Sequence, residues 1–100
     1  MFDGQEFKLG DDTYTIPPLN LKQTKKYLPI LQAMAGEKDI EKQIEAQKEV
    51  IQAAMSRNYP NITMGEIEEL VDIGNLGKIV LAITGMSGLV ASTDPPLAGK

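Results

Sequence analysis

The stretch from Lys38 to Arg57 constrains the fold more than any other part of this sequence. Apolar and uncharged residues recur there at intervals of three and four, which places them along one face of an α-helix. This face holds Ile40, Ile44, Gln47, Val50, Ile51, Ala54 and Met55. The charged residues Glu41, Lys42, Glu45, Lys48 and Glu49 fall mostly on the other side. The pattern predicts a long amphipathic helix, whose apolar face other elements must cover.

A short β-hairpin is predicted near the N-terminus. Apolar and polar residues alternate over residues 7–9 and 13–16, on either side of a turn-forming cluster at residues 10–12. Pro17 and Pro18 then end the second strand, because proline has no backbone donor for the ladder. An isolated hairpin is marginal in water, so it must lie on another part of the chain.

A first helix is expected to begin after Asn20, a good N-cap residue, and to run through Met34. Pro29 lies inside it and is expected to kink or restart the helix, because proline removes a backbone donor and clashes with the preceding turn. Gly36 is placed to end the helix at the C′ position. The apolar pattern of this segment includes Leu21, Thr24, Leu28 and Leu31.

Two further helices follow Asn58, where the long helix is expected to stop. Thr63 and Glu66 match a capping box that opens the first of them. Gly74 and Asn75 are expected to end that helix and start the last one. The inward residues of the acidic helix between these signals are Ile67, Leu70 and Val71.

Together these elements predict a mainly α fold, a small helical domain of about four helices with a short N-terminal β-hairpin. A chain of 100 residues with 42% hydrophobic residues is enough for one domain with an aliphatic core. Residues 1–91 are expected to form this domain, and residues 92–100 are expected to be a disordered tail because they contain two prolines and no periodic pattern.

The last predicted helix has a distinctive side. Its core arc is expected to contain Leu76, Ile79, Val80, Ile83, Met86 and Leu89. The opposite side carries a stripe of Gly77, Leu81, Gly85 and Gly88. Glycine inside a helix costs about 1 kcal/mol relative to alanine, so the stripe needs an explanation. Either the helix ends near Gly85, which we favour, or another backbone packs closely there.

This stripe is the candidate partner-binding surface. It consists of Gly77, Leu81, Gly85 and Gly88, and Met86 and Leu89 extend it if the end of the helix frays. The alternative is that the chain's own hairpin covers this side of the helix. A methionine suits a surface that accepts varied partner side chains, because it is unbranched and polarizable.

The composition argues against catalysis. The chain has no cysteine and no histidine, and it therefore lacks a thiolate, the usual general base near neutral pH and the commonest metal ligand. Ser87 does not have the spacing of a nucleophile elbow. We predict no catalytic, metal or cofactor-binding residue and no cofactor. The acidic residues Glu66, Glu68, Glu69 and Asp72 are interpreted as a solvated helix face.

Charge and hydropathy limit the classes of partner and the cellular location that we expect for this chain. A net charge of -4 argues against nucleic acid, which selects a basic face. The lysines at 22, 25 and 26 are interpreted as solvated. The longest uncharged stretch, residues 79–93, is shorter than the roughly 20 apolar residues that span a bilayer. Asp3 and Glu6 interrupt any signal-like apolar run. We therefore expect a cytoplasmic protein that does not bind membranes.

Several short phrases, taken in order, carry a family resemblance. They are Phe7-Lys8-Leu9-Gly10, Tyr14-Thr15-Ile16-Pro17-Pro18-Leu19, Ala53-Ala54-Met55-Ser56-Arg57-Asn58-Tyr59-Pro60, Ile62-Thr63 and Ile83-Thr84-Gly85-Met86-Ser87-Gly88-Leu89. In this order, over roughly residues 7–89, the chain resembles the tail assembly chaperones of long-tailed bacteriophages.

The resemblance implies a non-virion helper in the host cytoplasm. Such a protein binds the tape-measure protein and keeps it soluble until tail-tube subunits polymerise around it. The implied partners are the tape-measure protein and, as a second one, the tail-tube protein, with self-association as a further option. The residues themselves are equally compatible with a small cytosolic helical adaptor or regulatory protein-binding module in an unrelated pathway.

Overall fold

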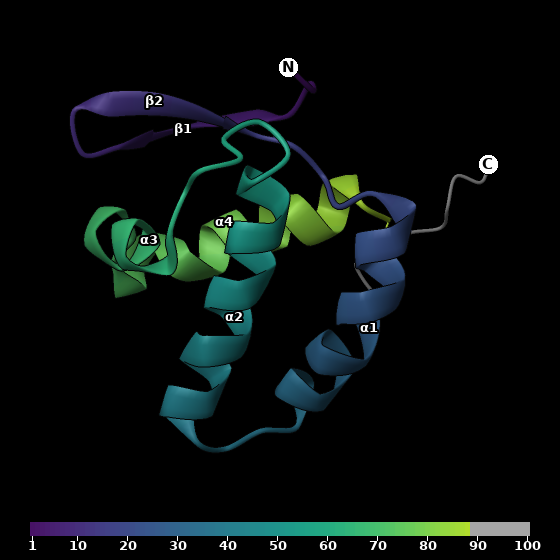
Figure 1. Cartoon of the computed structure of the whole chain (residues 1–100). Coiled ribbons are helices and arrows are strands. Elements are labelled where there is room, and N and C mark those ends of the chain that lie inside the picture. Colours follow the sequence, from purple (N-terminus) through teal and green to yellow (C-terminus); the bar gives the residue numbers. More distant parts are fainter. Residues whose placement is uncertain (89–100) are drawn as a thin grey trace, which may run out of the picture.

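A computed structural model describes residues 1–88 of the chain. Within that part, four helices and one two-stranded antiparallel sheet confirm the predicted mainly α fold with an N-terminal hairpin (Figure 1). Leu89 and the predicted tail at 92–100 lie outside the described residues. The elements in chain order are β1 (Gln5–Leu9), β2 (Asp12–Ile16), α1 (Leu21–Ala35), α2 (Ile40–Met55), α3 (Met64–Leu70) and α4 (Ile73–Met86).

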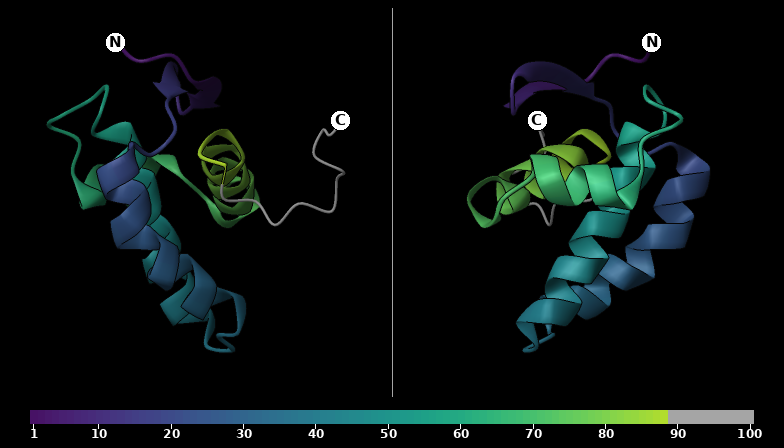
Figure 2. Two further views of the ribbon diagram at one scale, coloured as in Figure 1. Left: turned by 90° about the vertical axis from the view of Figure 1, so that its right-hand side faces the viewer. Right: turned by 60° about the vertical axis from the view of Figure 1, so that its left-hand side comes forward.

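The hairpin forms where the sequence predicts it. Phe7 of β1 pairs with Tyr14 of β2, and Gly10 in the turn has a φ of 66°, a conformation that side chains with a Cβ rarely adopt. Leu9 and Ile16, which end the two strands, are buried among the helices. The hairpin lies across the end of α2 and over α4 (Figures 1 and 2).

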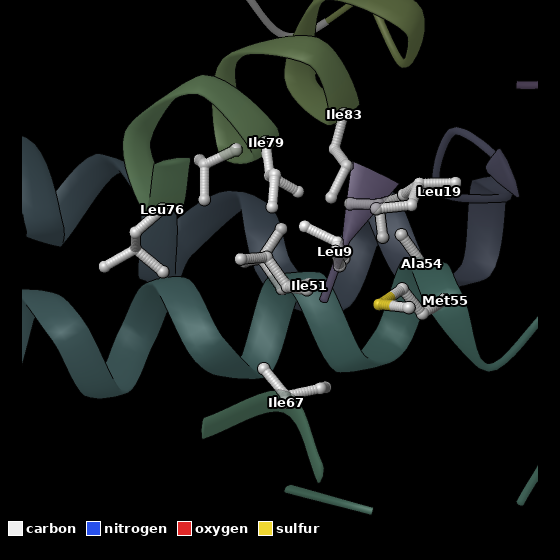
Figure 3. Close-up of a cluster of buried hydrophobic side chains, with 12 residues drawn as sticks. Leu9, Leu19, Ile51, Ala54, Met55, Ile67, Leu76, Ile79 and Ile83 are labelled. Carbon is white, nitrogen blue, oxygen red and sulfur yellow. The ribbon is translucent and has the colours of Figure 1, made fainter. Parts of the chain in front are cut away.

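Helix α2 is at the centre of the fold and contacts each of the other three helices. It packs against α1, α3 and α4, and it also touches β2. Ile79 and Ile83 of α4 point toward Ile51 of α2 (Figure 3). Burying a side chain of this size is worth about 1.5–3 kcal/mol. The core consists of Leu9, Ile16, Leu19, Val50, Ile51, Ala54, Met55, Ile67, Leu76, Ile79, Val80 and Ile83.

Helix α1 is less buried than its apolar pattern predicts. It has no buried residue, and both Leu21 and Leu28 are exposed. The predicted cap is present, since the Asn20 side chain accepts a hydrogen bond from the backbone N–H of Gln23 at 2.8 Å. Of the predicted kink or restart at Pro29, the restart is wrong, because α1 continues through the proline as one helix, and the kink stays a prediction. Pro29 is exposed, and so is Lys25, whose carbonyl loses its donor, so water can satisfy this carbonyl.

Three predicted helix ends are corrected as well. Gly36 is the C-cap of α1 with a φ of -102°, so it does not take the left-handed C′ conformation. Helix α2 begins after Asp39 and ends at Met55, with Ser56 as its C-cap, so it is shorter at both ends than residues 38–57. Ile40 was predicted to point inward but is 65% exposed, because the first turns of α2 project beyond α4 and the hairpin (Figures 1 and 2).

The capping box of α3 is confirmed. Thr63 accepts a hydrogen bond from the Glu66 backbone N–H at 3.1 Å, and Glu66 accepts one from the Thr63 backbone N–H at 2.9 Å. The predicted boundary at Gly74 and Asn75 is wrong. A second capping box, in which Asp72 accepts from the Asn75 backbone N–H at 2.9 Å, starts α4 earlier and places both residues in its first turn.

Candidate functional site

The two sides of α4 have opposite environments. Ile79 and Ile83 are fully buried, whereas Leu81 on the predicted stripe is 65% exposed. A Cβ added at Gly77 would meet no atom within 4 Å. The hairpin therefore does not cover this side, and that alternative is wrong. The physical reason is that the apolar ends of the hairpin, Leu9 and Ile16, join the core cluster of α2 and α4 instead.

An open groove of about 640 Å³ lies beside the exposed side of α4. The second half of α1 and the Gly77–Leu81 side of α4 form its walls, and α2 contributes Gln47. None of the lining residues is charged. They are Leu28, Leu31, Gln32, Met34, Ala35, Gln47, Gly77, Val80, Leu81 and Thr84. The volume is in the usual range for a binding site, about 300–1,000 Å³.

The lining suits an apolar partner surface. The Thr84 hydroxyl donates to the backbone carbonyl of Val80 at 2.9 Å, so its polar atom is already satisfied inside α4. Leu28, Leu81 and Met34 supply branched and flexible apolar contacts, and Gly77 leaves room for a closely approaching backbone. An amphipathic helix docks into grooves of this kind through its apolar face.

The rest of the predicted stripe belongs to the end of α4 and not to the groove. The helix ends at Met86, with Ser87 as its C-cap and Gly88 at a φ of 77°, which confirms the favoured early end. Met86 was predicted in the core arc but is exposed. Gly85 and Gly88 are exposed and do not line the groove, and Leu89 lies outside the described residues.

Ser87 has a structural role at this end. Its hydroxyl accepts a hydrogen bond from the Leu19 backbone N–H at 2.9 Å and donates one to the Ile83 carbonyl at 2.6 Å. The serine thus ties the linker after the hairpin to the last turn of α4. These two hydrogen bonds account for a polar residue at position 87.

The phrases that carry the family resemblance meet at one junction. The Thr15 backbone N–H donates to the Tyr59 hydroxyl at 2.8 Å, and the Asn58 amide donates to the Thr15 carbonyl at 3.0 Å. Arg57 Nη1 donates to the Pro18 carbonyl at 2.6 Å. Together with Ser87, these residues fasten the hairpin and its linker to α2 and α4. The phrases therefore build the scaffold and do not line the groove, apart from Thr84.

A second hollow of about 500 Å³ lies against α2, α3 and the start of α4. Lys48, which the sequence placed on the solvated side, lines it and is only 8% exposed. Its ammonium is paired with Glu45 at 2.8 Å and with Glu68. Hydrogen bonds from Lys48 to Glu45 and Glu68 raise the pKa of the lysine above its ordinary value. This network joins α3 to α2, and we interpret it as structural.

Residues 1–88 hold no group of three or more histidine, cysteine, aspartate or glutamate side chains placed to bind a metal ion. No helix in the same range is long and apolar enough to cross a membrane.

Sequence reasoning identified the α4 wall of the groove but missed the α1 wall. The signal for it was present, because Leu28, Leu31 and Ala35 recur at helical spacing.

Comparisons of the chain with protein-family models, curated proteins and solved structures found no match, so the resemblance to tail assembly chaperones stays a prediction.

Proposed function

We propose that this chain is a non-catalytic binding protein that docks the apolar face of a partner helix in the groove between α1 and α4. The observation that carries the proposal is Leu81, a leucine 65% exposed on the wall of an uncharged groove. Apolar surface gathered in a hollow marks a binding site more often than single scattered residues do. Gly77 beside it supports a close approach of the partner.

The partner that the family resemblance points to is the tape-measure protein of a tailed phage. In that role the chain is a tail assembly chaperone, which keeps a long helical protein soluble in the host cytoplasm and promotes assembly of tail-tube subunits around it. Such a partner presents many similar amphipathic turns. A groove lined by leucine, methionine, alanine and glycine suits it, because these residues select a shape and an apolar face and no particular polar group.

A small helical adaptor for an unrelated protein would use the same groove. The experiment must therefore separate the groove from the identity of its occupant. We propose co-expression of a tape-measure fragment with the wild-type chain, with Leu81→Asp and with Ile73→Asp. Ile73 is the matched control, because it lies on the same helix, is 71% exposed and lines the second hollow instead of the groove.

The wild-type chain and Ile73→Asp are expected to keep the fragment in the soluble fraction. Leu81→Asp is expected to lose it while its circular dichroism spectrum stays helical, because a carboxylate on the groove wall has no partner once an apolar helix covers it. If Leu81→Asp still solubilises the fragment, the groove is not the docking site. If the wild-type chain itself fails to keep the fragment soluble, the tape-measure assignment is wrong and the adaptor hypothesis gains.

A further inference from the structure

The walls of the groove differ in charge from the rest of the molecule. Helix α1 contains three lysines and helix α4 contains one, and neither helix contains aspartate or glutamate. The chain as a whole has a net charge of -4. The groove therefore lies between two positively charged helices of a negatively charged protein. The four lysines are Lys22, Lys25, Lys26 and Lys78.

Helical spacing places two of these lysines within one turn of residues that line the groove. Lys25 precedes Leu28 by three residues and Gln32 by seven, so it lies one turn before the α1 wall of the groove, along the edge that Leu28 and Gln32 form. Lys78 follows Gly77 and precedes Leu81 by three residues, so it neighbours the exposed leucine on α4. Both lysines are exposed. Lys22 and Lys26 instead line a separate hollow beside Tyr27 and Gln52.

Several acidic residues of the neighbouring elements line other hollows. Glu41, Glu45 and Glu49 of α2 line a hollow that also contains Ile30. Glu68 of α3 is paired with Lys48, and Asp72 caps α4; both line the second hollow. The charge at the rim of the groove is therefore not cancelled by these acids.

We propose that the groove selects an amphipathic helix whose apolar stripe is flanked by aspartate or glutamate. This inference rests on the proposed function and adds the chemical class of the partner helix. The apolar contacts supply affinity, while Lys25 and Lys78 attract acidic flanks and disfavour basic ones. The acidic surface elsewhere repels the same partner, so an acidic helix is directed to the groove.

The test uses two designed helical peptides with the same leucine stripe at positions i, i+3, i+4 and i+7. One peptide carries glutamate at the flanking positions and the other carries lysine, and both bear the same fluorescent label. Binding is followed by fluorescence anisotropy at low salt with four proteins: the wild type, Lys25→Glu/Lys78→Glu, Lys8→Glu/Lys42→Glu and Leu81→Asp. The Lys8 and Lys42 pair is the matched control, because it changes the net charge equally at exposed positions elsewhere, Lys8 in β1 and Lys42 in the hollow that contains Ile30.

The wild type is expected to bind the glutamate peptide about tenfold more tightly than the lysine peptide, since each exposed charge pair contributes only modestly. The preference is expected to shrink in high salt, which screens exposed charges. The variant Lys25→Glu/Lys78→Glu should reverse the preference, and the control pair should retain it. Leu81→Asp should weaken the binding of both peptides.

Three results would overturn the inference, and they separate it from the proposed function. If the wild type binds both peptides equally and Leu81→Asp binds neither, the groove is the binding site but has no charge preference. Peptide binding that Leu81→Asp leaves unchanged would remove the groove itself and with it the proposed function. Concentration-dependent self-association in sedimentation, abolished by Leu81→Asp, would assign the groove to a second copy of the chain.

Discussion

The two sides of α4 lie in different environments although both carry large aliphatic side chains. On one side Ile79 and Ile83 are fully buried against α2, and the core depends on them. On the other side Leu81 is mostly exposed and Gly77 has no neighbour within 4 Å of a Cβ position. One side of this helix therefore stabilises the fold, while the other side is left exposed within residues 1–88.

The exposed side also has a cost. Glycine in a helix interior destabilises it by roughly 0.5–1 kcal/mol relative to alanine, and Gly77 needs no special φ. A sequence selected for stability alone would have alanine there and a polar residue at position 81. Functional surfaces commonly carry such a penalty, because binding and stability select different residues.

The largest effect is expected on the buried side. Ile83→Ala should lower the free energy of unfolding by about 2–5 kcal/mol, because it removes buried methyl groups and leaves a cavity. Leu81→Ala is the control on the exposed side and should change it by less than about 0.5 kcal/mol. Urea unfolding of both variants provides the measurement. Similar losses for the two would show that the two sides are not distinct.

A smaller effect, of opposite sign, is expected at Gly77. Gly77→Ala should raise the free energy of unfolding by up to about 1 kcal/mol, because the added methyl meets no atom within 4 Å and alanine favours the helix. The same variant should solubilise a partner less well, since the methyl occupies the groove. Thermal melting and the co-expression assay measure the two properties.

Gly65→Ala in α3 is the control for this prediction. A Cβ there meets only the Thr63 hydroxyl at 3.9 Å, an ordinary contact, and the residue is not in the groove. It should not change partner binding. If Gly77→Ala stabilises the fold and binding is unchanged, no backbone approaches closely at this glycine.

Local signals in the sequence predicted most of the fold. The caps at Asn20 and Thr63 were predictable because their hydrogen-bond partners lie three residues away. Burial that depends on distant segments was not. Lys48 is buried because Glu68, twenty residues later, reaches it from α3, and Ile40 is exposed because α4 crosses α2 farther along. Periodicity gives the face of a helix on which a residue lies but not the element that this face meets.

The same reason explains what was missed at the site. The α4 wall was predictable because Gly77 and Leu81 break the pattern of a buried helix. The α1 wall was missed although Leu28 and Leu31 recur at helical spacing, because that spacing looks the same for core residues and for residues beside an open groove. Gly85 and Gly88 were included in the surface because glycine serves both helix termination and close packing, and spacing alone cannot separate these roles.

The central claim is that the Leu81 side of α4 is exposed. The most direct test compares the urea unfolding of Leu81→Asp with that of Val80→Asp. The two positions are adjacent in α4, but Val80 is only 6% exposed. Leu81→Asp is expected to unfold within about 0.5 kcal/mol of the wild type, as a surface substitution does. Val80→Asp is expected to lose several kcal/mol or fail to fold, because it buries an unpaired carboxylate. A loss for Leu81→Asp as large as that for Val80→Asp would show that this side of the helix belongs to the core, and would contradict the account.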